Sequence, residues 1–163
     1  MDHLTRLEEL LNQANLDIKD GYYEEASNKL EEIINTDPSF GKAYNHLGYL
    51  YEAKFKDYEK AETLYKLAIE KSPSYPSVYY NYAILLSTLE KFDELKELLD
   101  IAIKVPGITK ATIYNEFGIM YEQKGDYDKA IEHYRLAGKA TLSNDILKKV
   151  KDSIERCKSK REL

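Results

Sequence analysis

A chain of 163 residues with 43% hydrophobic side chains can bury a continuous core, which excludes a largely disordered protein. Its 24 Lys and Arg against 29 Asp and Glu give a formal charge of −5, which disfavours bulk nucleic-acid binding. No stretch reaches membrane-spanning length, and no basic leader precedes an apolar run. The single cysteine, Cys157, suits a reducing compartment. From these observations together we expect a cytoplasmic protein without a membrane segment.

Apolar residues recur at helical spacing along most of the chain, which predicts a series of amphipathic helices. The predicted helices are residues 4–19, 22–36, 41–54, 58–71, 76–89, 91–104, 110–124 and 127–141. Asp20-Gly21 and Lys124-Gly125-Asp126 break the chain within a pair of helices. Asp37-Pro38 and Ser72-Pro73 end the second helix of a pair, because proline cannot continue a helix.

A period near 35 residues relates these helix pairs to one another. Tyr44, Tyr79 and Tyr114 follow each other at steps of 35 residues. A second set follows at steps of 35, 34 and 35, each member three residues after an aromatic residue: Ala26, Ala61, Leu95 and Ala130. A fixed period of this size indicates stacked supersecondary units.

The residues at these positions resemble a known repeat. The fourth unit carries, in order, Tyr114, Phe117-Gly118, Tyr121, Ala130, Tyr134 and Ala137, and the second carries Tyr44, Leu47-Gly48, Tyr51, Ala61, Tyr65, Ala68 and Pro73. This series is similar to the tetratricopeptide repeat pattern of aromatic, Leu-Gly, Tyr, Ala, aromatic and Ala. The resemblance covers roughly residues 7–142. It implies an all-α fold, a right-handed superhelical solenoid of antiparallel helix pairs.

We expect residues 1–142 to form four repeats, at about 7–40, 41–75, 76–110 and 111–142. Residues 143–163 break the repeat and predict a C-terminal capping helix with a basic tail, because Ile146, Val150 and Ile154 form an apolar stripe. Whether this basic helix binds an acidic partner or only caps the array stays open.

No constellation in the sequence predicts catalysis. The three histidines, His3, His46 and His133, have no metal-ligand spacing, and no glycine-rich phosphate loop is present. The carboxylates fall on faces expected to be solvated. We therefore expect no enzyme activity, no metal and no cofactor.

The resemblance implies that the first helix of each pair lines a concave, peptide-binding groove. The expected groove residues are Leu11, Asn12, Asn15, Asn45, Tyr49, Glu52, Tyr80, Asn81, Ile84, Asn115, Ile119 and Glu122. Asparagine amides can donate hydrogen bonds to a peptide backbone and accept them from it. The alternative, equally favoured, is that asparagine is tolerated at these positions without binding a peptide. Apolar Tyr49, Tyr80 and Ile84 near acidic side chains predict a partner with an apolar anchor and basic flanks.

The leading functional hypothesis is a non-enzymatic protein-interaction module or adaptor that binds a peptide or partner helix in this groove. One alternative is a small chaperone that holds apolar client segments. Another is a self-associating structural module, in which the groove of one copy receives the final helix of another. All three hypotheses predict a protein as the partner, and not nucleic acid or a membrane. Whether the chain forms a homo-oligomer stays open.

Overall fold

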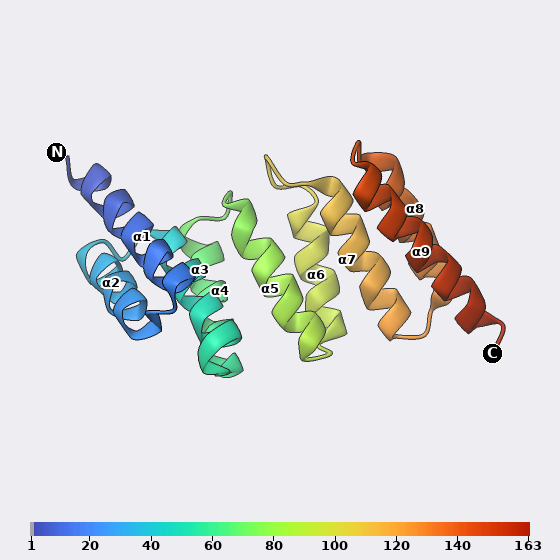
Figure 1. The fold of residues 1–163 in the computed structure, drawn as a ribbon, viewed down its shortest axis with the longest axis horizontal. Helices are drawn as coiled ribbons and strands as arrows, with labels where there is room; N and C mark the ends of the chain where they lie inside the picture. The colour runs from blue at the N-terminus through green and yellow to red at the C-terminus, as the bar shows by residue number, and fades with distance from the viewer. Residues whose placement is uncertain (1) are drawn as a thin grey trace. The chain divides into compact units, whose positions relative to one another are not determined.

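The computed structural model describes residues 2–163, which form helices and no strand. The helices are α1 (His3–Asp20), α2 (Tyr23–Thr36), α3 (Gly41–Leu50), α4 (Tyr58–Lys71), α5 (Pro76–Thr88), α6 (Phe92–Ala102), α7 (Lys110–Gln123), α8 (Tyr127–Ala140) and α9 (Asn144–Arg161) (Figure 1). A short π-helix, η1 (Tyr51–Phe55), directly follows α3. The all-α class and the paired arrangement are thus confirmed, with α3 and η1 together covering the predicted helix 41–54.

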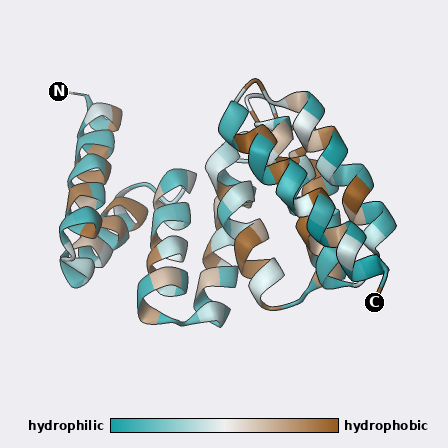
Figure 2. Cartoon of the chain, turned by 45° about the vertical axis from the view of Figure 1, so that its right-hand side comes forward, coloured by the Kyte–Doolittle hydropathy of each residue, from teal (hydrophilic) through white to brown (hydrophobic). Residues whose placement is uncertain are grey.

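The chain divides into two compact units, unit 1 (Met1–Leu85) and unit 2 (Leu86–Leu163). In unit 1, α1 packs on α2, and α3 packs on both α2 and α4. In unit 2, α7 packs on α8, and α8 packs on α9. Brown and teal stretches alternate along these helices in Figure 2, as expected where one face of each helix is buried and the other is solvated.

The turn inside each helix pair contains one residue with left-handed backbone. These residues are Gly21 (φ 89°), Lys56 (φ 57°), Glu90 (φ 55°) and Gly125 (φ 77°), which repeat the period of the sequence. After two of these turns an aspartate caps the next helix: the Asp57 carboxylate accepts from the Lys60 backbone N–H, and Asp126 accepts from that of Lys129. At these two turns the local sequence therefore both ends one helix and starts the next.

The π-helix η1 coincides with a one-residue insertion in the second repeat. Tyr51 and Tyr58 are seven positions apart, whereas the equivalent Tyr121 and Tyr127 are six apart. A π-turn absorbs an additional residue without ending the helix. The side chain of Phe55 at its end is 40% exposed, so the insertion brings an aromatic ring to the surface of unit 1.

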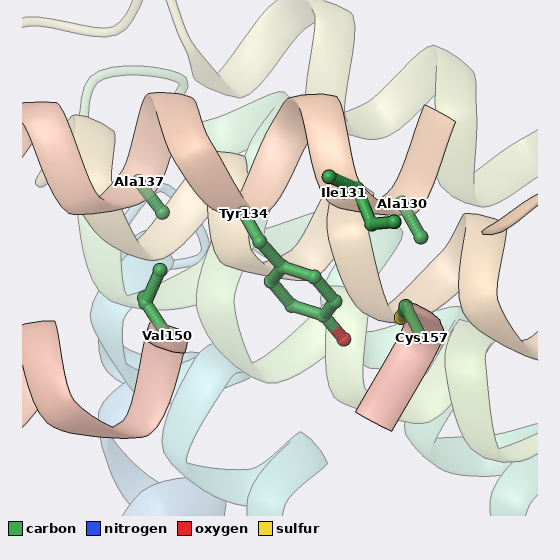
Figure 3. Packing of buried hydrophobic residues seen from close by; sticks show 6 residues of the cluster. All are labelled: Ala130, Ile131, Tyr134, Ala137, Val150 and Cys157. Carbon is green, nitrogen blue, oxygen red and sulfur yellow. The ribbon is translucent and has the colours of Figure 1, made fainter. Parts of the chain in front are cut away.

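The core of unit 2 centres on Tyr134, which is fully buried between α8 and α9. Figure 3 shows Ala137 of α8 facing Val150 of α9, with the hydroxyl end of Tyr134 directed toward the segment that carries Cys157. Cys157 is itself fully buried. The apolar stripe of α9 predicted from the sequence therefore contacts α8.

Gly118 of α7 allows this helix to approach α8 closely, because a Cβ atom there would lie 2.6 Å from the Tyr134 ring. We expect Gly118→Ala to lower the free energy of unfolding by about 1–2 kcal/mol, since overpacking outweighs the gain in helix propensity. Gly138→Ala is the matched control, because its Cβ would meet the Val150 side chain no closer than 3.3 Å. Urea denaturation measures both variants, and equal stability would contradict the packing account.

Candidate functional site

A pocket of about 380 Å³ opens in unit 1 where first helices of successive pairs meet. Its lining residues come from α1, α3, α5 and the turn before α5: Asn15, Ile18, Asn45, His46, Tyr49, Tyr75, Ser77, Tyr80 and Asn81. We name it the α1–α3–α5 pocket. It is large enough for a few side chains of a bound peptide.

Amides and aromatic rings are arranged together in this pocket. The Asn81 side-chain amide donates to the side-chain oxygen of Asn45 over 3.1 Å. Asn45 is only 2% exposed, whereas the Tyr49 side chain is 37% exposed. The Asn45–Asn81 hydrogen bond fixes the orientation of both amides. The pocket thus has a preorganised polar edge next to exposed aromatic surface.

The lining of the pocket carries no formal charge at neutral pH. Burial and, to a lesser extent, the charge of Lys42 lower the pKa of His46, so its imidazole is neutral there. The Lys42 ammonium in turn pairs with Glu8 at 2.7 Å. An uncharged pocket of amides and aromatic rings suits an apolar side chain with the polar peptide backbone on either side of it.

Five of the predicted groove residues line this pocket: Asn15, Asn45, Tyr49, Tyr80 and Asn81. Leu11 does not line the pocket, because its side chain is 4% exposed and belongs to the core. Asn12 is exposed and Ile84 is 51% exposed, but neither lines the pocket. Glu52 is half-buried and accepts a hydrogen bond from the Tyr65 hydroxyl at 2.5 Å, and its desolvation raises its pKa.

The predicted residues of unit 2 have different surroundings. Asn115 lines a small pocket of about 150 Å³ with residues of α7 and α9. Ile119 packs against the core around Tyr134. Glu122 accepts two hydrogen bonds of 2.7 Å from the Arg156 guanidinium and one of 2.8 Å from Lys160. The Glu122 carboxylate is therefore engaged within unit 2, and its role in the groove stays a prediction.

Ile18 and Tyr75 line the pocket, although the sequence did not predict a role for them in the groove.

The spacing of polar pairs in the sequence indicates which first helices contact each other. Glu8 and Lys42 are 34 residues apart, and so are Glu122 and Arg156, while Asn45 and Asn81 are 36 apart. Complementary side chains one repeat apart therefore contact each other across successive first helices. The pair of Glu122 with Arg156 indicates that α9 occupies the place of a further first helix.

Residues 2–163 hold no group of three or more His, Cys, Asp or Glu side chains positioned to bind a metal ion. Within the same range, no helix is long and apolar enough to cross a membrane. The cytoplasmic location stays a prediction.

Comparison with known protein families decides the classification. Two sequence models described as tetratricopeptide repeat match residues 11–76 and 111–140, which together span more than half of the chain. The chain belongs to the tetratricopeptide repeat family. It is accordingly an all-α helical repeat solenoid of the protein-interaction class, and members of this family are typically non-enzymatic scaffolds.

Individual tetratricopeptide proteins give the same classification. Heat shock protein STI1 of Saccharomyces cerevisiae is 31% identical over 109 residues, which are 66% of this chain but 18% of that protein. A thermophilic tetratricopeptide protein of Thermus thermophilus superposes with a TM-score of 0.75 at 18% identity, covering 91% of this chain and 81% of the other. One from Parabacteroides merdae gives a TM-score of 0.78 at 16% identity, covering 94% and 59%. These structural likenesses concern the fold alone.

Proposed function

We propose that this chain is a non-enzymatic adaptor that binds a peptide or helix of a partner protein in the α1–α3–α5 pocket. The observation that carries the proposal is the uncharged cluster of aromatic rings and oriented amides on adjacent first helices of unit 1. Tyr49 and Tyr80 supply the surface for one apolar anchor. Aromatic side chains of this kind dominate the energy of many protein interfaces.

The amides specify how the partner backbone is held. Asn45 and Asn81 share one hydrogen bond, which leaves further donor and acceptor capacity on the Asn81 amide, because Asn81 is half-buried whereas Asn45 is only 2% exposed. An extended peptide beside the anchor offers backbone N–H and C=O groups that match this capacity, independently of its sequence. The pocket lining itself carries no acidic residue, so we propose basic flanks only for partner residues that extend toward Glu52.

Self-association through the basic final helix is disfavoured by contacts inside unit 2. Arg156 and Lys160 pair with Glu122, and Arg161 pairs with Asp128 at 2.6 Å. These cations are engaged within one chain, so they are less accessible to a second copy. The chaperone alternative differs from the adaptor in selectivity, because a chaperone holds several unrelated unfolded clients through apolar surface.

Selection from a displayed library of natural peptide segments tests the adaptor proposal. We expect selected peptides to share one apolar anchor, and Tyr80→Ala to weaken their binding at least tenfold, as for a hot-spot aromatic residue. Tyr22→Ala is the matched control, because Tyr22 is 59% exposed and lies outside the pocket. Equal losses for the two variants, or no selected peptide, would refute the site. If several unfolded proteins stay soluble in a Tyr80-dependent way, the chaperone reading replaces the adaptor.

A further inference from the structure

A second pocket, of about 410 Å³, lies in unit 1 between α2 and η1 and shares no lining residue with the α1–α3–α5 pocket. We name it the α2–η1 pocket. Its lining residues are Glu24, Ser27, Asn28, Glu31, Tyr51 and Phe55. One wall is therefore polar and acidic, and the opposite wall is aromatic.

The polar wall is a single face of α2. Glu24, Ser27, Asn28 and Glu31 stand at relative positions 0, 3, 4 and 7, which lie on one side of an α-helix. The two carboxylates are separated by two helical turns, about 10 Å along the axis. Neither carboxylate forms an ion pair with another residue in the described range 2–163. The hydrogen bond with Tyr51 and, to a lesser extent, the charge of Glu31 raise the pKa of the Lys60 ammonium, which lies over the Tyr51 ring. The face thus offers two negative charges at a fixed spacing, with hydroxyl and amide groups between them.

The aromatic wall results from the one-residue insertion in the second repeat. The rings of Tyr51 and Phe55 meet edge to face with centroids 5.2 Å apart. Because η1 absorbs the additional residue, Phe55 stands at the end of the π-helix with 40% of its surface exposed. π-Helical turns of this kind occur frequently at functional sites.

Two lysine side chains of unit 1 lie over aromatic rings in or near this pocket. The Lys60 ammonium lies 4.0 Å from the centroid of the Tyr51 ring, and the Lys54 ammonium lies 5.1 Å from that of Tyr23. Both contacts have the geometry of a cation–π interaction, and the Tyr51 ring belongs to the aromatic wall of the pocket. Phe55 has no such lysine over its ring among the described residues, so its face stays accessible to an external cation or apolar group.

We propose that the α2–η1 pocket binds a basic helical segment of a partner protein, with two cationic side chains seven positions apart and an apolar side chain between them. The two cations pair with Glu24 and Glu31, and the apolar side chain packs against Phe55. Seven positions in the bound helix match the carboxylate spacing on α2, since both helices rise by the same distance per residue. Arginine is favoured over lysine, because a guanidinium binds a carboxylate through two hydrogen bonds and stacks on an aromatic ring.

Two designed peptides test this inference on the full chain. Both are alanine-based helices with two arginines and one leucine; in the first the arginines are seven positions apart, and in the second five apart, on different faces. We expect fluorescence anisotropy to detect binding of the first peptide at least tenfold tighter than the second. Glu31→Gln and Phe55→Ala are each expected to weaken the first peptide about tenfold.

Glu32→Gln is the matched control, because it removes the same charge one position away, outside the pocket lining. It is expected to leave the affinity within about twofold. The proposal would be overturned if both peptides bound equally, or if Glu31→Gln and Glu32→Gln had equal effects, because binding would then depend on net charge alone. It would also be overturned if the first peptide did not bind. Tyr80→Ala is expected to leave this binding unchanged, so its outcome is separate from that of the α1–α3–α5 pocket.

Discussion

Replacing Tyr134 by alanine is expected to destabilise the protein strongly, by about 3–5 kcal/mol of unfolding free energy. The reason is complete burial: the ring is 0% exposed, lies against Gly118, and contributes to the core that joins α8 to α9. Alanine would leave a cavity that the closely approaching helices cannot fill. Urea denaturation followed by circular dichroism measures the loss.

Tyr134→Phe separates the ring from its hydroxyl group. The hydroxyl donates to Glu122 over 2.8 Å, so phenylalanine is expected to cost only about 1 kcal/mol. Alkylation of the fully buried Cys157 gives a reading local to unit 2, since the thiol is reached only when α9 opens. If Tyr134→Ala left both the unfolding free energy and the alkylation rate unchanged, the assignment of this core would be wrong.

The second large effect concerns Glu122, which links α7 to α9. We expect Glu122→Ala to lower the unfolding free energy by about 2 kcal/mol, because the Arg156, Lys160 and Tyr134 donors lose a shared, charged acceptor. The Glu122 side chain is 9% exposed, so water does not replace the lost interactions without cost. The alkylation rate of Cys157 is expected to rise about thirtyfold if α9 opens on its own.

Glu155→Ala is the control on α9 itself. Glu155 pairs with Lys158 three residues away, but its side chain is 70% exposed. An exposed pair of this kind contributes little, so the expected change is within about 0.5 kcal/mol. Equal effects of Glu122→Ala and Glu155→Ala would contradict the assignment of Glu122 as the residue that fixes α9.

The same network predicts a pH dependence with a defined sign. Hydrogen bonds from Arg156, followed by those from Lys160 and Tyr134, lower the pKa of Glu122 from 4.5 to about 2 against the opposing effect of burial. A lowered carboxyl pKa contributes stability above the unfolded value, and this contribution is lost as the pH falls from about 4.5 to about 2. The difference in unfolding free energy between wild type and Glu122→Gln should therefore shrink across this window. A constant difference would contradict the account.

The sequence allowed the fold to be predicted because its period is expressed in residues with a packing role. Tyr44, Tyr79 and Tyr114 mark equivalent first helices, and all three lie in helices at the expected places. The π-helix was not predictable from periodicity, which specifies helical faces and not the hydrogen-bond pattern of one turn. The only sequence feature that accompanies the π-helix is the spacing of seven residues between Tyr51 and Tyr58, one more than in the fourth repeat.

The lining of the α1–α3–α5 pocket was predictable in part, for a physical reason. Asn45, Tyr49, Tyr80 and Asn81 could be assigned to first helices, and the same local periodicity brings them into one pocket. Leu11 does not line this pocket, because α1 buries this position in the core of unit 1. The engagement of Glu122 depends on where α9 docks, a tertiary feature that the composition of residues 143–163 does not specify.

Photo-crosslinking from inside the α1–α3–α5 pocket shows directly whether a partner peptide binds there. A benzophenone amino acid would replace Tyr80 in one variant and the exposed Tyr22, outside the pocket, in another, and each would be irradiated with a peptide selected by the wild-type chain. The account predicts a covalent adduct at position 80, mapped to the apolar anchor of the peptide, and none at position 22. Adducts at position 22 alone, or equally at both positions, would contradict it.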